Sequence, residues 1–373
     1  MIKKESRLKS LDLFRGLTVA AMILVNTPGD GDNVYPALEH SKWNGCTPTD
    51  LVFPCFLFMV GVSIVFALKN KRDDPHSHFK VLLGAFRRMI FIIAIGIGIQ
   101  LFERFDFAHL RYPGVLQRIG VVYFISTFLY LKFNNRVLGY FFAFSLISYY
   151  IVMAFVSAPN GQLTNLEPAT NMAAYIDRFV FTPIHMKKDT RLWDPLGLLS
   201  TLPAIASTLF GVGVGLWLNR TDIENRDKVI HLFVLATISI VAGLFWNLFF
   251  PINKPLWSSS YVLYSAGICL LGFTITYWYV DINPGGKYLW PLLVFGKNAI
   301  SAYILSEIMP TFINMIKVNW NGTKTDGMSF LSLQIFSGIL SPRNASLLGA
   351  CCFVFFIWLL MYPLFRKNIY FKV

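Results

Sequence analysis

The fold is decided by the stretch "EHSKWNGCTPTDLVFPCFLFMVGVSIVFAL", which runs from Glu39 to Leu68. Its first part is polar and contains His40 and Asp50, and from Leu51 onward it carries no charged residue. A helix needs about twenty mainly apolar residues to cross the hydrocarbon core of a bilayer. The stretch therefore predicts a membrane helix that begins directly after a polar segment with a histidine.

The composition extends this prediction to the whole chain. Of the 373 residues, 55% are hydrophobic and 14% are charged, and the mean hydropathy is +0.54. A soluble protein could not bury this much apolar surface. The sequence predicts an all-α fold, a polytopic membrane bundle of about ten transmembrane helices in a single domain, residues 1–373. The apolar windows lie near 11–27, 51–68, 86–102, 114–131, 136–156, 198–218, 229–250, 257–280, 289–316 and 346–365.

The window 289–316 differs from the others because it contains Lys297, Asn298 and Pro310. We expect this span to be tilted or broken, since polar residues and proline interrupt an otherwise continuous apolar helix. The longest connection, Ser157 to Asp194, contains turn-forming residues. We expect that connection to pack as a lid or cap.

The basic residues indicate how the chain is oriented in the membrane. The net charge is +13, but no soluble segment interleaves basic residues with stacking aromatics, so nucleic acid binding is excluded. With the N-terminus inside, the inner connections carry nineteen lysines and arginines in 63 residues, and the outer ones carry eleven in 110. Cytoplasmic loops are enriched in basic residues. Both termini are therefore predicted to be cytoplasmic, with His40 outside.

Processing signals and metal motifs are weak in this sequence. The N-terminus has no small-x-small cleavage pattern before Asp30, so we expect a retained first helix rather than a signal peptide. Four of the five cysteines lie in apolar windows, and their arrangement predicts neither a disulfide framework nor a metal site.

His40 is the best candidate for chemistry. An imidazole titrates near neutral pH and suits acid-base or nucleophilic work. Asp50 could orient the ring through its N–H. Asn26, at the outer end of the first window, either caps a helix end or donates a hydrogen bond to a developing oxyanion. Trp43 and Asn44 are residue types that contact sugars, so we assign them to substrate binding.

Polar residues at membrane depth mark a second group of candidates, because such positions are costly without a function or a partner. Arg15 either pairs with Asp12, three residues earlier, or binds an anion on the cytoplasmic side. Lys297, beside Asn298, either anchors the end of its span or binds a phosphate. Arg118 needs a polar cavity or a carboxylate such as Asp50, and a structural pair and a ligand contact both remain open.

Several of these stretches resemble a known family. They include "RLKSLDLFRGLTVAAMILVN", "HSKWNGCTPTDLVFPCFLFMVG", "GVLQRIGVVYF", "NKPLWSSSYVL" and "FGKNAISAYILSE". They are similar to the membrane region of heparan-α-glucosaminide N-acetyltransferase, and still more to its NagX-like bacterial relatives. The resemblance runs from about Ser6 to the last helix. The motif around His40 is its most specific part, because other membrane acyltransferases share something like the "LDLFRG" motif.

The resemblance implies an enzyme that takes acetyl from cytoplasmic acetyl-CoA and gives it to the amino group of a terminal glucosamine across the membrane. The family's active-site histidine falls on His40, and its neighbouring asparagine falls on Asn26. For the donor we expect contacts from Arg15, Arg118, Lys297 and Asn298, without a metal. The large luminal domain of the animal enzyme has no counterpart, so we expect a bacterial inner membrane protein rather than a heparan-specific one.

Other functions fit part of the pattern. A sugar carrier would also have about ten helices with polar residues at depth, although we find no two-fold repeat of the kind carriers commonly show. An O-acyltransferase of an envelope polysaccharide would follow the same logic with another acceptor. The sequence leaves open the acceptor, the oligomeric state, a homodimer included, and whether acetyl passes through His40 or directly to the amine.

Overall fold

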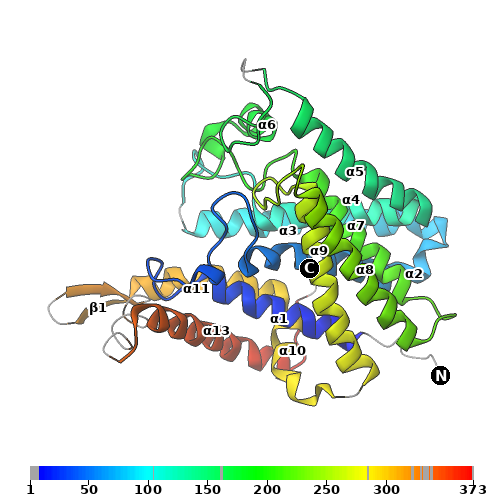
Figure 1. Ribbon diagram of the computed structural model, residues 1–373. Coiled ribbons are helices and arrows are strands. Elements are labelled where there is room, and N and C mark those ends of the chain that lie inside the picture. The colour runs from blue at the N-terminus through cyan, green and yellow to red at the C-terminus, as the bar shows by residue number, and fades with distance from the viewer. Residues whose placement is uncertain are drawn as a thin grey trace. The chain divides into compact units, whose positions relative to one another are not determined.

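The computed structural model describes residues 8–103, 105–159, 163–283, 285–320, 323–327, 330, 336 and 339–371. The chain divides into two compact units. The terminal unit comprises Met1–His40, Thr47–Val52 and Gly272–Val373, and the central unit comprises Ser41–Cys46 and Phe53–Leu271. Figure 1 shows the elements of both units.

The elements are mostly helices. The terminal unit contains α1 (Lys9–Asn26), the short helices η1 (Pro36–Leu38), η2 (Pro48–Leu51), η4 (Trp278–Ile282) and η5 (Gly286–Leu289), α10 (Trp290–Lys297), α11 (Ala299–Met315), the hairpin β1 (Lys317–Trp320) and β2 (Thr323–Asp326), and α13 (Pro342–Arg366). The central unit is built from α2 (Val52–Arg72), α3 (Pro75–Glu103), α4 (Val115–Lys132), α5 (Asn135–Phe155), α6 (Met172–Phe181), η3 (Pro183–His185), α7 (Thr201–Leu218), α8 (Asn225–Trp246) and α9 (Ser259–Tyr277), whose last residues belong to the terminal unit.

The membrane character predicted from composition is confirmed. In the described part of the chain, eight helices are long and apolar enough to cross a bilayer, or up to nine if α10 and α11 form one span. α1 carries the charged residues Lys9, Asp12 and Arg15 and is not among them. The expectation for the window 289–316 is also confirmed, because the helices on either side of Asn298 are bent by 71°.

Glycine allows close helix packing in the terminal unit, where α1 and α10 lie against each other (Figure 1). A Cβ on Gly16 would lie 1.9 Å from the carbonyl oxygen of Leu292, and one on Gly296 would lie 1.8 Å from that of Asp12. The two backbones are therefore in direct contact, which only small residues permit.

In the central unit, α2 and α7 also pack closely through glycine. A Cβ on Gly61 would lie 2.0 Å from the carbonyl oxygen of Thr208, and one on Gly211 would lie 2.0 Å from that of Phe58. Cys55 of α2 and Cys269 of α9 form a disulfide, which the sequence pattern did not indicate.

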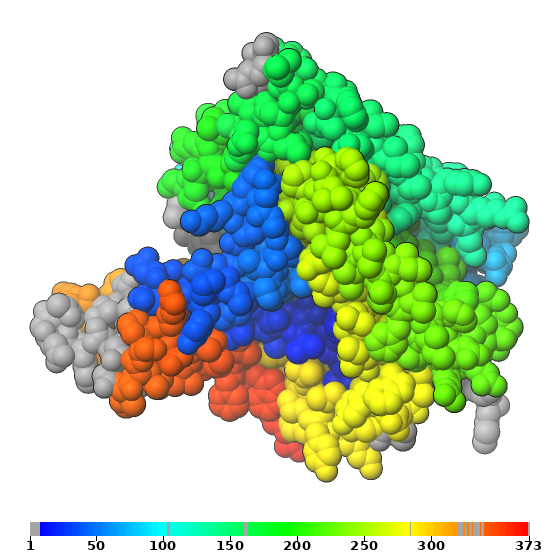
Figure 2. Space-filling view, in the orientation of Figure 1, coloured from blue at the N-terminus to red at the C-terminus, as the bar shows by residue number. Residues whose placement is uncertain are grey.

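The outward faces of the central unit fit a lipid environment. α5 and α8 lie at its surface in the view of Figure 2. Apolar side chains on these helices, among them Phe144, Ile151, Ile238 and Phe245, are exposed. Apolar surface of this kind needs no protein cover in lipid, because lipid tails are themselves apolar.

Candidate functional site

His40 and Asp50 form the centre of the candidate site, and both belong to the terminal unit. The Nδ1 atom of His40 lies 2.8 Å from Oδ1 of Asp50. The Asp50 side chain is 1% exposed, whereas that of His40 is 55% exposed. A buried carboxylate at this distance favours the tautomer with hydrogen on Nδ1 and leaves the lone pair on Nε2.

Local structure holds Asp50 in place. Thr47 and Asp50 form a capping box at the start of η2, which leads directly into α2. The Thr47 N–H donates to Oδ2 of Asp50 at 3.0 Å, and the Asp50 N–H donates to the Thr47 carbonyl oxygen at 3.0 Å. The Thr47 hydroxyl lies 2.6 Å from the carbonyl oxygen of Glu39, the residue before the histidine. The box that starts the membrane helix therefore also fixes the residue that orients His40.

Asn26 is the last residue of α1, and its side chain is exposed. The connection from Asn26 to His40 is fastened to the start of α13. The backbone N–H of Asp30 donates to the Ser346 hydroxyl at 2.9 Å, and that hydroxyl donates to the Asp30 carbonyl oxygen at 2.9 Å. The Tyr35 hydroxyl donates to Oδ1 of Asn344. The two predicted catalytic residues thus flank a connection with a defined path.

Trp43 and Asn44 follow His40 in the sequence but belong to the central unit. The Trp43 indole N–H donates to the Leu166 carbonyl oxygen at 3.0 Å, and its ring packs edge-on against Trp193 with the centroids 5.0 Å apart. The side-chain oxygen of Asn44 accepts a hydrogen bond from the amide of Asn253 at 3.2 Å. Next to it, Gly45 has a φ of 108°, a left-handed conformation that favours glycine.

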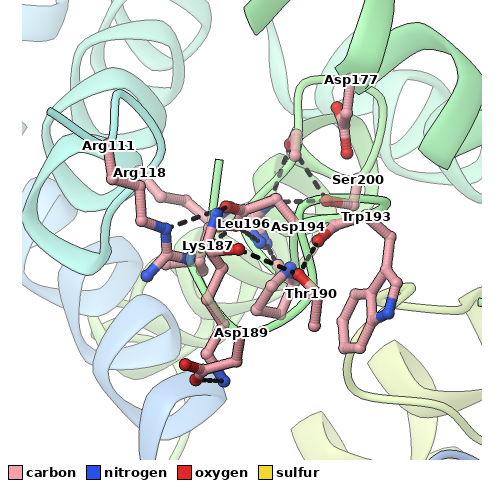
Figure 3. Close-up of polar contacts among 12 residues, drawn as sticks. Arg111, Arg118, Asp177, Lys187, Asp189, Thr190, Trp193, Asp194, Leu196 and Ser200 are labelled. Atoms are coloured by element: carbon pink, nitrogen blue, oxygen red, sulfur yellow. Dashed lines mark hydrogen bonds and ion pairs between the residues drawn. The ribbon is translucent and has the colours of Figure 1, made fainter. Parts of the chain in front are cut away.

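Trp193 is presented by a segment that the buried carboxylate of Asp194 organises (Figure 3). The Arg111 guanidinium donates to it twice, at 2.6 and 2.9 Å. The backbone N–H groups of Lys187 and Leu196 donate to the same carboxylate, each at 2.9 Å. Because Arg111 lies in the connection between α3 and α4, Asp194 joins two connections of the central unit that are far apart in sequence.

Replacing Asp194 by alanine should destabilise the central unit by about 2–4 kcal/mol, because Arg111 and two backbone donors lose a buried acceptor. The measurement is the thermal unfolding midpoint of the purified protein, with proteolysis of the 182–193 segment as a second readout. Asp189→Ala is the matched control, because Asp189 is 79% exposed and pairs with Lys187 at 3.6 Å. Equal midpoints for the two variants would contradict this role of Asp194.

Asp177 of α6 is a second buried carboxylate in this region (Figure 3). The Leu198 N–H donates to its Oδ1 at 2.8 Å. Burial raises the pKa of Asp177 to about 7, and the nearby Asp194 also raises it, while the Leu198 N–H, Arg118 and Arg178 act in the opposite direction. The folded protein therefore holds this proton at pH values where the unfolded chain has released it.

The raised pKa of Asp177 predicts a pH dependence of stability. Between about pH 4 and pH 7 the folded state binds more protons at this residue than the unfolded state, so its contribution to stability falls as pH rises through that window. Asp177→Asn should remove this part of the dependence. Thermal unfolding midpoints from pH 5 to pH 8 test it, and an unchanged slope in the variant would show that Asp177 does not titrate there.

Arg118 of α4 is 3% exposed and belongs to the same region of the central unit. Its guanidinium donates to the Gly197 carbonyl oxygen at 2.8 Å and to the Ser200 hydroxyl, and it lies over the Trp257 ring at 5.3 Å. Its buried Nε has no hydrogen-bond partner within the described residues. The guanidinium thus holds the start of α7. A contact between Arg118 and acetyl-CoA stays a prediction.

The other residues predicted to contact acetyl-CoA come together in the terminal unit, at the end of α10. Arg15 pairs with Oδ1 of Asp12 at 3.1 Å, as one of its two interpretations required, and also donates to the Gly296 carbonyl oxygen at 3.3 Å. Lys297 and Asn298 follow Gly296 at the bend between α10 and α11. Within the described residues, no group of three or more His, Cys, Asp or Glu could hold a metal ion.

The amino-acid sequence matches one protein family over most of its length. Residues 7–247 match the family model of the catalytic region of heparan-alpha-glucosaminide N-acetyltransferase. The chain belongs to this family. Asn26, His40, Asp50 and the Trp43–Asn44 pair all fall in the matched region, whereas Lys297 and Asn298 lie beyond it.

Two curated members of the heparan-alpha-glucosaminide N-acetyltransferase family show how far the similarity extends. The human protein of that name is 27% identical over 423 aligned positions, which cover 98% of this chain and 60% of the human one. The mouse protein is 29% identical over 362 positions, which cover 82% of this chain and 54% of the mouse one. The chain therefore spans a little over half the length of these relatives.

The structure adds residues that the sequence had not singled out. Trp193 contacts the predicted substrate residue Trp43, and Asn253 bonds to Asn44. Asp194 organises the segment that contains Trp193. Asn253 is the first residue of "NKPLWSSSYVL", one of the stretches that carry the family resemblance. That resemblance was the sequence feature that could have identified Asn253. For Trp193 the available signal was its position beside an aspartate in the long connection between Ser157 and Asp194.

Proposed function

We propose that the chain is a transmembrane N-acetyltransferase of this family. It moves an acetyl group from cytoplasmic acetyl-CoA to the amino group of a glucosamine-type sugar at the outer face of the membrane. The observation that carries the proposal is the buried Asp50 carboxylate 2.8 Å from Nδ1 of the half-exposed His40. The family match and the names of the two relatives support it.

In this mechanism His40 acts through Nε2, while Asp50 holds its tautomer and stabilises the imidazolium. In the direct version, the amine nitrogen attacks the thioester carbonyl carbon and Nε2 takes a proton from it. The C–S bond then breaks, and the departing CoA sulfur receives that proton. In the two-step version, Nε2 attacks the carbonyl carbon, the C–S bond breaks and CoA leaves as the thiolate. The amine nitrogen then attacks the acetyl carbon, the bond from that carbon to Nε2 breaks, and Nε2 takes the proton that the amine loses.

The remaining predicted residues serve the two substrates. The Asn26 amide donates a hydrogen bond to the oxyanion of the tetrahedral intermediate. Arg15, Lys297 and Asn298 contact the donor at its phosphate-bearing end, Arg118 is a further donor contact, and Trp43 and Asn44 contact the sugar. The excess of basic residues in one set of connections supports cytoplasmic termini. The bacterial inner membrane rests on the resemblance to bacterial relatives alone.

Transfer assays with the purified protein test the proposal. Labelled acetyl-CoA is supplied with glucosamine or with glucose, which offers hydroxyl groups only. The expected product is N-acetylglucosamine, with no labelled glucose. Equal labelling of both sugars would replace the proposal by an O-acyltransferase, and no labelling of either would overturn acetyl transfer to simple sugars.

A sugar carrier is the second candidate, and the bend of 71° between α10 and α11 is the observation in its favour. Broken helices line the binding sites of many carriers. Sealed vesicles supplied with labelled glucosamine and no acetyl-CoA separate the two functions. Accumulation of unmodified sugar supports a carrier, and its failure to accumulate supports the enzyme.

A further inference from the structure

The segment that follows α13 returns to the bend between α10 and α11. Asn298 at this bend is 2% exposed, and both ends of its side-chain amide bond to that segment. Its Nδ2 donates to the Ile369 carbonyl oxygen at 3.0 Å, and its Oδ1 accepts from the Phe371 N–H at 3.3 Å. The amide therefore takes the place that a neighbouring strand would take, and it fixes the backbone on both sides of Tyr370.

Tyr370 lies on the other face of this short segment. Ile369 and Phe371 are exposed, whereas Tyr370 is half-buried, an alternation typical of an extended chain. Its hydroxyl lies 3.4 Å from Nζ of Lys297, and its ring centroid lies 5.5 Å from the same nitrogen. The two hydrogen bonds of the Asn298 amide thus orient Tyr370 toward Lys297.

Lys297 is held on a second side by Phe365 in the last turn of α13, whose ring centroid lies 5.0 Å from Nζ. Two aromatic faces attract an ammonium group and restrict where it can go. They do not neutralise its charge, and an ammonium carries three N–H donors. Arg15 donates to the Gly296 carbonyl oxygen, so a second cation lies beside the residue that precedes Lys297.

We propose that Tyr370 is a positioning residue for the acetyl donor, which aims the Lys297 ammonium at the phosphates of coenzyme A. The inference rests on the proposed function, because it takes acetyl-CoA as the donor and Lys297 as a donor contact. The Lys297 ammonium and the Arg15 guanidinium, which also pairs with Asp12 at 3.1 Å, lie at one helix end. Cationic groups so placed suit a phosphate-bearing ligand. Tyr370 itself acts through Lys297 and needs no contact with the donor.

Binding measurements on the full-length purified protein test this role. The probes are coenzyme A and pantetheine, which lacks the nucleotide and every phosphate. Tyr370→Ala should weaken coenzyme A binding about tenfold, because both the ring and the hydroxyl are lost. Tyr370→Phe keeps the ring and should weaken it only about two- to threefold. Pantetheine binding should be the same in all three proteins.

Tyr288→Ala is the matched control, because Tyr288 belongs to the same unit and is 90% exposed. It should bind coenzyme A as the wild type does. In the transfer assay, Tyr370→Ala should raise the KM for acetyl-CoA and leave kcat at saturating donor unchanged, which a merely structural role would not do.

The outcomes separate the two proposals. A wild type that does not bind coenzyme A overturns the proposed function and this inference with it. A wild type that prefers coenzyme A to pantetheine, with unchanged affinity in Tyr370→Ala, overturns only the role of Tyr370. An equal loss for coenzyme A and pantetheine also overturns it, because the effect would then not involve the phosphates.

Discussion

Replacing His40 by alanine should lower kcat for acetyl transfer by about 10³-fold, the scale expected when a general base or nucleophile is removed. Coenzyme A binding should remain, because the donor contacts are assigned to other residues. Asp50→Asn should have a smaller effect, about 10–100-fold, since the histidine remains but its tautomer is no longer enforced. Steady-state rates with acetyl-CoA and glucosamine measure both.

His109 provides a matched control for this prediction. Its Nδ1 lies 2.8 Å from Oδ2 of Asp106, the same distance as in the His40–Asp50 pair, but the Asp106 side chain is 49% exposed. His109→Ala should leave kcat within about twofold of the wild type, since exposed pairs contribute little. If His40→Ala retained wild-type turnover, His40 would have no part in the chemistry, whatever its geometry.

Replacing a glycine at the contact between α2 and α7 should have a large effect on the stability of the central unit. Gly211→Ala should destabilise the central unit by about 2–3 kcal/mol, because the new Cβ would lie 2.0 Å from the Phe58 carbonyl oxygen and α2 and α7 would have to separate. Gly213, two residues along the same helix, has no atom within 4 Å of the corresponding position. Gly213→Ala should be neutral or slightly stabilising, as alanine is the better helix former.

Thermal unfolding midpoints in one detergent compare the two glycine variants directly. A midpoint clearly lower for Gly211→Ala than for Gly213→Ala is the predicted result. Similar midpoints would mean that α2 and α7 can move apart at little cost, and the close backbone contact would not stabilise the unit.

The membrane helices could be predicted because hydropathy acts over whole windows. The interruption in 289–316 was visible from Lys297, Asn298 and Pro310, but its position was not. The bend falls at Asn298, whereas Pro310 lies inside α11. A proline can stay within a membrane helix when its surroundings satisfy the freed carbonyl, whereas Asn298 directs its amide to the segment after α13.

The candidate site was predictable where its parts are close in sequence. His40 and Asp50 are ten residues apart, and one helix start brings them together. Trp43 and Trp193 meet across 150 residues, and Cys55 and Cys269 across 214. Such contacts depend on how helices pack, which no local pattern records, and an apolar window hides a cysteine pair among residues of similar hydropathy.

Acetyl transfer across a sealed membrane is the direct measurement of the proposed reaction, because the two substrates are then on opposite sides. The purified protein is reconstituted into vesicles with glucosamine trapped inside, and labelled acetyl-CoA is added outside only. Wild-type vesicles should contain labelled N-acetylglucosamine, and vesicles that carry His40→Ala should contain none. Labelled product that forms only when glucosamine is also outside would contradict transfer across the membrane.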